Sequence, residues 1–228
     1  NLLRLNFEDN QKNIAELINK GVCKIQKDGY INIESVFEDA LKICMLRIIY
    51  SGNPRGEDRT AKEIYKRIKS IVGSMKVFVG GFEKNVIVKG NSLIDFLNSR
   101  GISINFDSDK EWNELFFFRN GHAYIFVRSI FVELITNFFK YADLNEEIAI
   151  KLKAVDGKFG IFQSNYVSEI IGTESGVGIS SKGKILKKMN GYESYYIKPV
   201  TSIEEDNMFE VLFVIDKKIF NISEVENG

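Results

Sequence analysis

A long, mostly apolar segment, Ala123 to Tyr141, limits the possible folds strongly because it carries three polar side chains on one side. Its length and composition predict a helix that is buried along most of its surface. Glu133, Asn137 and Lys140 follow each other at helical spacing, so they share one face. Buried polar groups need partners. Two explanations are open: the face binds a metal and phosphate, or it is a stripe exposed to solvent.

Two strands and a glycine-bearing turn follow this helix. Ile148 to Lys153 and Phe159 to Gln163 are predicted strands, joined at Asp156-Gly157, a favoured hairpin pair. Ser175-Gly176-Val177-Gly178-Ile179-Ser180 then leads into another helix. Glycines let backbone N–H groups approach a phosphate closely, and a helix N-terminus favours an anion. We expect this turn and the polar helix to converge at an edge of a sheet.

Further elements complete an α+β pattern. Ser92 to Ser99 is a predicted helix, and Ile102 to Phe106 alternates as a strand does. Tyr195 to Lys198 and Phe209 to Ile215 are two more strands, predicted to be antiparallel. Helices and strands interleave, which predicts a mixed sheet with helices covering one face.

The N-terminal third is predicted to be helical. Asp9 to Asn19 and Ser35 to Tyr50 have helical patterns, and Ser51 to Gly56 breaks the second one. A heptad-like row of apolar residues follows, formed by Ile64, Ile68, Ile71, Met75 and Phe78. Two helices joined by a loop form a hairpin, whose apolar stripe packs either on another copy of the chain or in its own core.

Gly80-Gly81 is expected to end this helical region. We therefore place a domain boundary near residues 80 to 90. The predicted domains are residues 1–85, a helical region like a dimerisation hairpin, and residues 86–228, an α+β domain.

Charge and composition exclude several classes of partner. Lys and Arg total 31 and so do Asp and Glu, so no overall field attracts a polyanion such as a nucleic acid. No apolar run reaches the roughly 20 residues that a membrane helix needs. Cys23 and Cys44 are too few for a disulfide framework, which fits a reducing, cytoplasmic location. The aromatic residues Trp112, Phe116, Phe117 and Phe118 are interpreted as packing.

The order of these motifs resembles the GHKL ATPase superfamily, and especially the catalytic domain of sensor histidine kinases, over about Leu93 to Ile215. The resemblance implies an α/β sandwich after a dimerisation hairpin, with Mg²⁺ and ATP as cofactors. Phe131 to Ala142 is similar to the family's N box. This implies that Asn137 coordinates magnesium, that Lys140 meets phosphate and that Glu133 occupies the position of the polar or general-base residue. Residues Gly176, Gly178 and Ser180 match the family's second glycine box and would bind the nucleotide.

The chain departs from the family at three places. The family's first glycine box has an aspartate that receives the adenine amino group, whereas this chain has Asn165, whose side-chain oxygen can accept instead. Only Ser168 to Glu174 separate the two boxes, so the lid over ATP is very short. The single histidine, His122, precedes the N-box helix and is not on the hairpin, where such kinases carry their phosphoacceptor.

Two functional hypotheses follow. The first is a histidine-kinase-type signalling module that binds Mg-ATP and either phosphorylates a histidine in another chain or hydrolyses ATP as a switch. Its partners would be a second copy, through the hairpin, and a response regulator or other phosphoacceptor. The second is a catalytically degenerate, dimeric scaffold that binds proteins and does not bind ATP. Whether the chain is an enzyme depends on which hypothesis holds.

Overall fold

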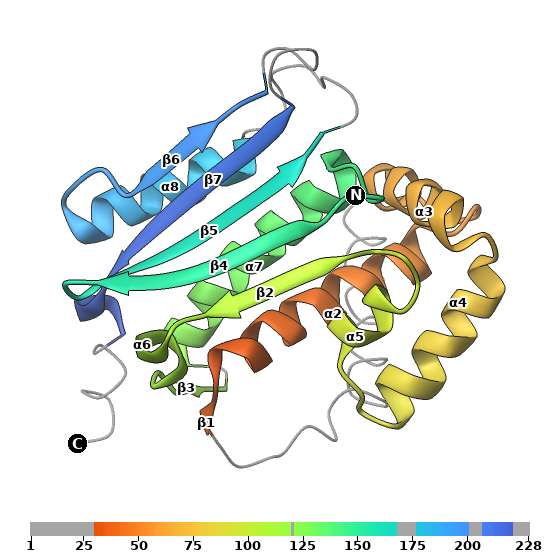
Figure 1. The fold of residues 1–228 in the computed structure, drawn as a ribbon, viewed down its shortest axis with the longest axis horizontal. Helices are drawn as coiled ribbons and strands as arrows, with labels where there is room; N and C mark the ends of the chain where they lie inside the picture. The colour runs from red at the N-terminus through yellow and green to blue at the C-terminus, as the bar shows by residue number, and fades with distance from the viewer. Residues whose placement is uncertain (1–29, 120, 168–176, 201–206, 221–228) are drawn as a thin grey trace, which may run out of the picture.

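A computed structural model describes residues 30–119, 121–167, 177–200 and 207–220 of the chain, which form an α+β fold around one mixed sheet (Figure 1). The strands lie in the order β2-β4-β5-β7-β6. β2 is parallel to β4, and every other neighbouring pair is antiparallel. The strands are β2 (Ile104–Ser108), β4 (Ile148–Val155), β5 (Lys158–Tyr166), β6 (Tyr195–Lys198) and β7 (Met208–Asp216). The predicted fold class is confirmed.

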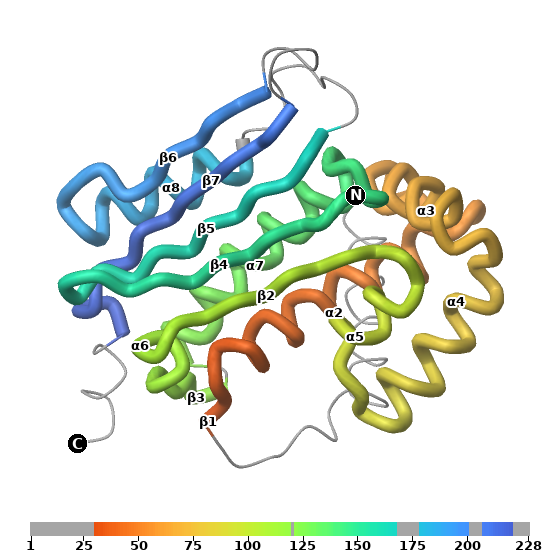
Figure 2. Tube along the Cα trace, in the orientation of Figure 1, coloured from red at the N-terminus to blue at the C-terminus, as the bar shows by residue number. Residues whose placement is uncertain are grey.

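Three helices lie on one face of this sheet (Figures 1 and 2): α2 (Ile33–Ser51), α7 (His122–Tyr141) and α8 (Val177–Asn190). The predicted positions of these helices are confirmed. Phe37 of α2 stacks on Phe106 of β2, with ring centroids 4.7 Å apart, and meets Phe131 of α7 edge-on at 5.2 Å. Helix α7 therefore lies in the centre of the core, between the sheet, α2 and α8.

The helical hairpin consists of α2 and α3 (Arg59–Val72). Each begins at a side-chain cap: Asn32 accepts from the backbone N–H of Ser35, and Asp58 from that of Ala61. Helix α3 ends at Gly73, whose φ of 72° suits a glycine, and α4 (Met75–Phe82) follows. The heptad-like row is therefore divided between two helices.

The expectation that Gly80-Gly81 ends the helical region is wrong. Both glycines lie inside α4, which passes directly into a π-helical turn, η2 (Glu83–Val88). The rings of Phe78 and Phe82 are buried, with centroids 5.3 Å and 6.3 Å from that of Phe96 in α5 (Leu93–Asn98). This packing outweighs the low helix propensity of the two glycines.

The buried side chains on both sides of residue 85 belong to one continuous core. The ring contacts of Phe37 with β2 and α7 are part of it. The division into domains 1–85 and 86–228 stays a prediction. In the described residues, the hairpin and the sheet pack as one unit.

The hairpin between β4 and β5 has the predicted turn. Asp156 and Gly157 both have positive φ, 52° and 74°, as a two-residue turn of this kind requires. The strand expected at Ile102 begins two residues later, at Ile104, where pairing with β4 starts. The side-chain oxygen of Asn98 accepts from the backbone N–H of Ile104 at 2.7 Å.

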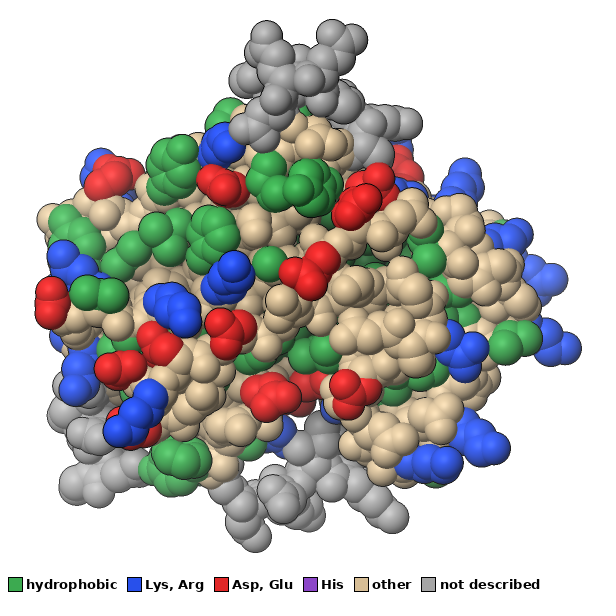
Figure 3. Space-filling model, viewed as in Figure 1, with side chains coloured by type: hydrophobic (Ala, Val, Ile, Leu, Met, Phe, Trp, Pro, Cys, Tyr) green, Lys and Arg blue, Asp and Glu red, His purple; other side chains and the backbone are tan. Residues whose placement is uncertain are grey.

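Among the described residues, no helix lies on the other face of the sheet, and Figure 3 shows hydrophobic side chains gathered on it over β5, β6 and β7. Their register explains the cluster. Phe162 pairs with Leu212, which pairs in turn with Tyr196, while Lys151 lies on the other side of Phe162. Tyr196 is more than half exposed. The open face therefore carries an apolar row at Phe162, Leu212 and Tyr196, beside Lys151 of β4. A polar row formed by Ser164, Glu210 and Lys198 lies two residues away on the same face.

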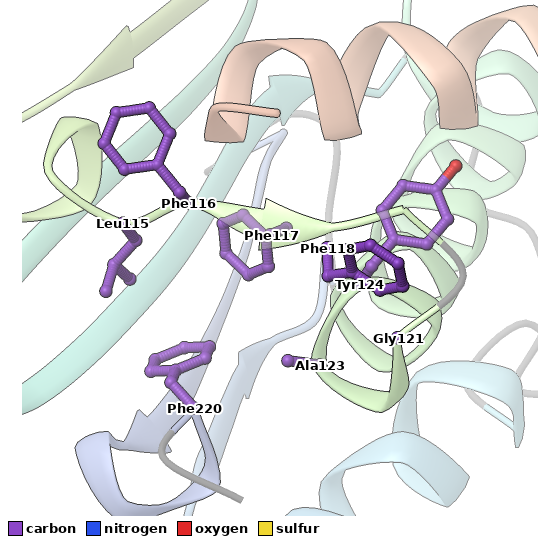
Figure 4. A pocket seen from close by; sticks show the side chains of 8 residues that line it. All are labelled: Leu115, Phe116, Phe117, Phe118, Gly121, Ala123, Tyr124 and Phe220. Atoms are coloured by element: carbon purple, nitrogen blue, oxygen red, sulfur yellow. The ribbon is translucent and has the colours of Figure 1, made fainter. Parts of the chain in front are cut away.

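Of the four aromatic residues predicted to pack, Trp112 and Phe117 are buried at the end of the sheet, whereas the prediction is wrong for Phe116 and Phe118, which are 65% and 56% exposed. Trp112, in α6 (Lys110–Asn113), is fully buried and meets Phe159 and Phe220 edge-on. A short strand, β3 (Phe117–Phe118), pairs with β1 (Tyr30–Ile31) beside it, and a 3₁₀ turn, η4 (Lys217–Ile219), precedes Phe220. Figure 4 shows a small pocket lined by Leu115, Phe116, Phe117, Phe118, Gly121, Ala123, Tyr124 and Phe220.

The predicted helix at Asp9 to Asn19 lies outside the described residues. Within the described ranges, no helix has both the length and the apolar character needed to span a bilayer.

Candidate functional site

Helix α7 presents its polar residues along the flank that faces α8. Lys182 of α8 donates a hydrogen bond to the Ser129 hydroxyl at 3.1 Å, and Glu133 lies one turn further along the same flank. The opposite flank faces α2, where the Cys44 thiol lies 3.8 Å from the carbonyl of Val132. The predicted row of Glu133, Asn137 and Lys140 is half-buried, so it is neither a core stripe nor a fully solvated one.

The carboxylate of Glu133 touches the first turn of α8. A Cβ atom built on Gly178 would lie 2.2 Å from Glu133 Oε2, so a side chain at this position would have to displace the carboxylate. A negative charge is favourable at a helix N-terminus. The expected convergence of the polar helix and the glycine-bearing turn is therefore present for this pair.

Asn137 and Lys140 lie beyond that contact, towards the C-terminal end of α7. The amide nitrogen of Asn137 donates to the carbonyl of Glu133 at 2.8 Å, which leaves its side-chain oxygen as the atom suited to a cation. The ammonium of Lys140 lies 4.8 Å from the centre of the Tyr141 ring. This cation–π contact is weak enough for a phosphate to replace it.

The end of β5 reaches the same region. Residues 142 and 167 form a β-bridge, and the backbone N–H of Asp143 donates to the carbonyl of Tyr166 at 2.7 Å. Asn165, the predicted acceptor, points into the helix-covered side and is only 2% exposed. Its side chain is already engaged: the oxygen accepts from Gln163 at 2.8 Å, and the nitrogen donates to the carbonyl of Tyr166 at 3.2 Å.

Helix α7 is bound to the hairpin at both ends. Near its start, Asp39 of α2 accepts from the Tyr124 hydroxyl at 2.9 Å and from Arg119 at 3.2 Å. At its end, the guanidinium of Arg67 in α3 donates to the carbonyls of Phe139 and Ala142. These carbonyls have no intrahelical partner of their own, so Arg67 caps the helix.

The structure brings together part of the predicted site. Glu133 and Gly178 are in contact. The end of α7, which carries Asn137 and Lys140, lies beside the end of β5, which carries Asn165. Figure 1 shows the arrangement of these elements. Ser180 is half-buried in the first turn of α8. Gly176 and the short lid, Ser168 to Glu174, lie outside the described residues.

His122 begins α7, eleven residues before Glu133, which is about 16 Å along a helix axis. The chain has one histidine. The hairpin therefore carries no histidine, as the sequence indicated.

The side-chain oxygens of Asn137 and Glu133 could hold magnesium only if the phosphates of a nucleotide supplied further ligands. In the part of the chain that is described, no group of three or more His, Cys, Asp or Glu side chains is placed to hold a metal ion. Mg²⁺ is commonly held by one or two protein oxygens together with phosphates and water. Asn137 and Glu133 supply oxygens of that kind beside the turn at Gly178.

Sequence reasoning did not single out Gln163, a buried polar residue beside Asn165. Its side chain is fully buried on the same side of β5 as Asn165, and its oxygen Oε1 has no hydrogen-bond partner in the described residues. The spacing was visible in the sequence: the two amides are two residues apart, so in a strand they face the same way.

A separate groove of about 530 Å³ lies between α2 and the segment from Val86 to Ser92, away from this site. Its central acid, Glu38, is occupied structurally, because it accepts from the Ser92 hydroxyl and from the backbone N–H groups of Leu93 and Ile94. These bonds cap α5. We therefore assign Glu38 a structural role.

Comparison with known proteins gives weak likenesses to histidine kinases. The catalytic domain of histidine kinase ThkA, in a nucleotide-free form, has 17% identity and a TM-score of 0.38, with 67% of this chain and 92% of that chain covered. The Acinetobacter baumannii histidine kinase AdeS has 12% identity and a TM-score of 0.38, covering 78% and 94%. ThkA in complex with the response regulator protein TrrA has 12% identity and a TM-score of 0.40, covering 95% and 66%.

No protein-family model and no curated protein matches the chain. Likenesses at this level assign neither a family nor an activity. The function is therefore inferred from the chain's own residues.

Proposed function

We propose that the protein binds Mg-ATP where α7, the first turn of α8 and the end of β5 meet, and that it works as a histidine-kinase-type signalling module. The observation that carries this proposal is the contact between Glu133 and Gly178. It brings an acidic side chain to a glycine in the first turn of a helix, a combination suited to a metal-bound phosphate. Asn137 and Lys140 extend the same flank of α7.

Each side chain has a chemical role in this proposal. Backbone N–H groups at the start of α8 bind phosphate oxygens, and Gly178 allows their close approach. Asn137 ligates Mg²⁺, and Lys140 neutralises phosphate charge. Glu133 polarises the attacking group. Catalysis of this kind depends on positioning and on charge stabilisation.

The group that receives the phosphoryl is proposed to lie outside this chain, because the single histidine is at the start of α7 and the hairpin has none. The acceptor is then a histidine in another chain, or water if ATP hydrolysis drives a switch. A homodimer, a response-regulator partner and a cytoplasmic location belong to the same proposal. The apolar residues Ile64, Ile68, Met75 and Phe78 of the heptad-like row are buried in the chain's own core, so a dimer contact would have to use another surface.

Calorimetric titration with a non-hydrolysable ATP analogue and Mg²⁺ tests the site. We expect binding that Asn137→Ala weakens about tenfold or more, since a metal ligand is lost. Asn105→Ala is the matched control, because Asn105 is exposed on β2, at the opposite end of the sheet order from β6 and β7. It should bind as the wild type does. If millimolar nucleotide does not bind, or if both variants lose affinity equally, the proposed site is wrong.

A catalytically degenerate scaffold is the second candidate, and one observation favours it. The Glu133 carboxylate already occupies the space beside Gly178 that a phosphate would approach. If this carboxylate is a permanent structural partner of α8, the titration will show no nucleotide binding. The protein would then act through its surfaces, such as the apolar row on the open face of the sheet.

A further inference from the structure

The groove between α2 and the segment from Val86 to Ser92 has the size of a ligand site. Its volume of about 530 Å³ falls within the roughly 300 to 1,000 Å³ of pockets that hold small organic molecules. One wall is the polar side of α2, and the other begins in the π-helical turn η2. Such turns are frequent at functional sites. Neither Glu133 nor Gly178 lines the groove, so it is separate from the proposed nucleotide site.

The two most buried acids of the groove already have partners. Glu38 accepts three hydrogen bonds at the start of α5. Asp39 accepts from the Tyr124 hydroxyl and from Arg119. Glu34 also lines the groove, but it is exposed to solvent in the first turn of α2. The acids therefore offer little to a cationic ligand.

The two basic side chains beside these acids keep N–H groups without partners. Lys42 is only 16% exposed, and its one described partner is Glu38, 3.8 Å from the ammonium, which is beyond hydrogen-bond length. The Arg119 side chain is 20% exposed and donates to Asp39 through Nη2, while its Nε has no hydrogen-bond partner in the described residues. An ammonium has three donors and a guanidinium five. Donors left unpaired at such burial call for an explanation.

These two cations lie on the same side of α2. Asp39, which binds Arg119, precedes Lys42 by three residues, and residues three apart are neighbours on a helix surface. The facing wall is apolar, because Val86, Ile87 and Val88 of η2 line it. The Val88 side chain is exposed there. The groove therefore combines a cationic side with a hydrocarbon side.

We propose that this groove binds a small organic monocarboxylate. The carboxylate lies between Lys42 and Arg119, and the hydrocarbon part lies on the η2 wall. A single negative charge suits the groove better than two, because three acids of α2 also line it and would repel a dianion such as a phosphate ester. The carboxylate supplies acceptors to the unpaired donors, and the hydrocarbon part removes apolar surface from water.

A series of ligands that differ only in the head group tests the proposal on the wild-type protein. Hexanoate, 1-hexanol and hexylammonium are titrated in turn into ¹⁵N-labelled protein without nucleotide, and the amide NMR signals are followed. We expect hexanoate to bind with a dissociation constant on the order of millimolar, as for other ligands of its size. It should bind about tenfold more tightly than hexanol, and hexylammonium should bind least. The signals of Gly90 and Asn91, which line the groove, should shift.

The variant Lys42→Met keeps most of the side-chain volume and removes the charge. Its affinity for hexanoate should fall about tenfold, while its affinity for hexanol should stay within about twofold of the wild type. Lys151→Met is the matched control, because Lys151 is exposed on β4 and does not line the groove. It should bind hexanoate as the wild type does.

Several results would overturn the proposal. It is wrong if hexanoate and hexanol bind the wild type equally, if none of the three ligands binds, or if the signals that shift lie away from the groove. It is also wrong if Lys42→Met keeps the preference for hexanoate or if Lys151→Met loses it equally. The wild-type series needs no variant, so a substitution that prevents folding does not remove the test. Because nucleotide is absent, the result does not depend on the proposed function.

Discussion

Cys44 lies where α2 meets α7, and its environment suppresses ionisation. Burial, the main influence, raises the pKa of the thiol from 9.0 to about 12, and the charge of Glu133 adds to the rise. The contact with the Thr136 hydroxyl and the charge of Arg47 act in the opposite direction. The thiol therefore stays protonated at neutral pH in the folded protein.

The Cys44 thiol should make stability depend on pH above 9. Its pKa is higher in the folded than in the unfolded chain, so its contribution to folding is complete below pH 9.0 and is lost as the pH rises towards 12. Between pH 8 and 10.5, the wild type should lose about 2 kcal/mol more unfolding free energy than Cys44→Ala does. Urea unfolding of both proteins at the two pH values measures this. Equal losses would contradict the pKa rise.

Single residues also show what the sequence could and could not predict. The positive φ values of Asp156 and Gly157 follow from local chemistry, because few residue pairs suit that turn. The helical conformation of Gly80 and Gly81 does not follow from local chemistry. It depends on the packing of Phe78 and Phe82 against Phe96, which is further along the sequence. The burial of Gln163 was not predicted, because it depends on which face of β5 the helices cover, and the sequence of one strand does not reveal that face.

At the scale of elements, the capping of α7 by Arg67 links the hairpin to the candidate site. The guanidinium reaches across from α3 to two carbonyls at the end of the helix that carries Asn137 and Lys140. Charge-assisted hydrogen bonds of this kind stabilise more than neutral ones. The cap also places a positive charge at a helix C-terminus, where it is favourable.

We expect Arg67→Met to destabilise the protein by about 2 to 3 kcal/mol, because partly buried carbonyls lose their donor. Arg59→Met is the matched control on the same helix. Within the described part of the chain Arg59 pairs with Glu63, its side chain is 93% exposed, and its loss should cost below about 0.5 kcal/mol. Thermal or urea unfolding measures both. A loss for Arg67→Met no larger than that of the control would show that the cap contributes nothing.

Strong helical patterns were enough to predict α2 and α7, whose apolar positions repeat over several turns. The heptad-like row was harder to interpret. The sequence shows the spacing of the apolar residues. In the structure, however, Gly73 has a positive φ that ends α3 within the row, and Ser74 caps the start of α4. Apolar spacing alone does not distinguish one long helix from two shorter ones that continue the same stripe.

At the scale of the whole molecule, the continuous core predicts cooperative unfolding. Trp112, the one tryptophan of the chain, is fully buried against Phe159 and Phe220, far in sequence from α2 and α3. Its fluorescence and the helical circular dichroism signal should therefore change at the same urea concentration. Two separate transitions would instead support the sequence-based division near residue 85.

The overall class of fold was predictable because helices and strands alternate along the chain and only a few layered arrangements bury them. The strand order was not, because β2 pairs with β4 and β5 pairs with β7 across long intervals of sequence. The same long-range strand pairing determines which polar residues come into contact. The contact between Glu133 and Gly178 depends on α8 lying beside α7, which follows from the sheet.

Because α7 is attached to α2 at its start and to α3 at its end, its backbone is restrained before any ligand arrives. A ligand that binds along its flank has to order only side chains, which reduces the loss of conformational entropy on association. If either attachment were removed, the loss of conformational entropy on ligand binding would become larger again. The hairpin can in this way change the affinity of the flank for a ligand without touching the ligand itself.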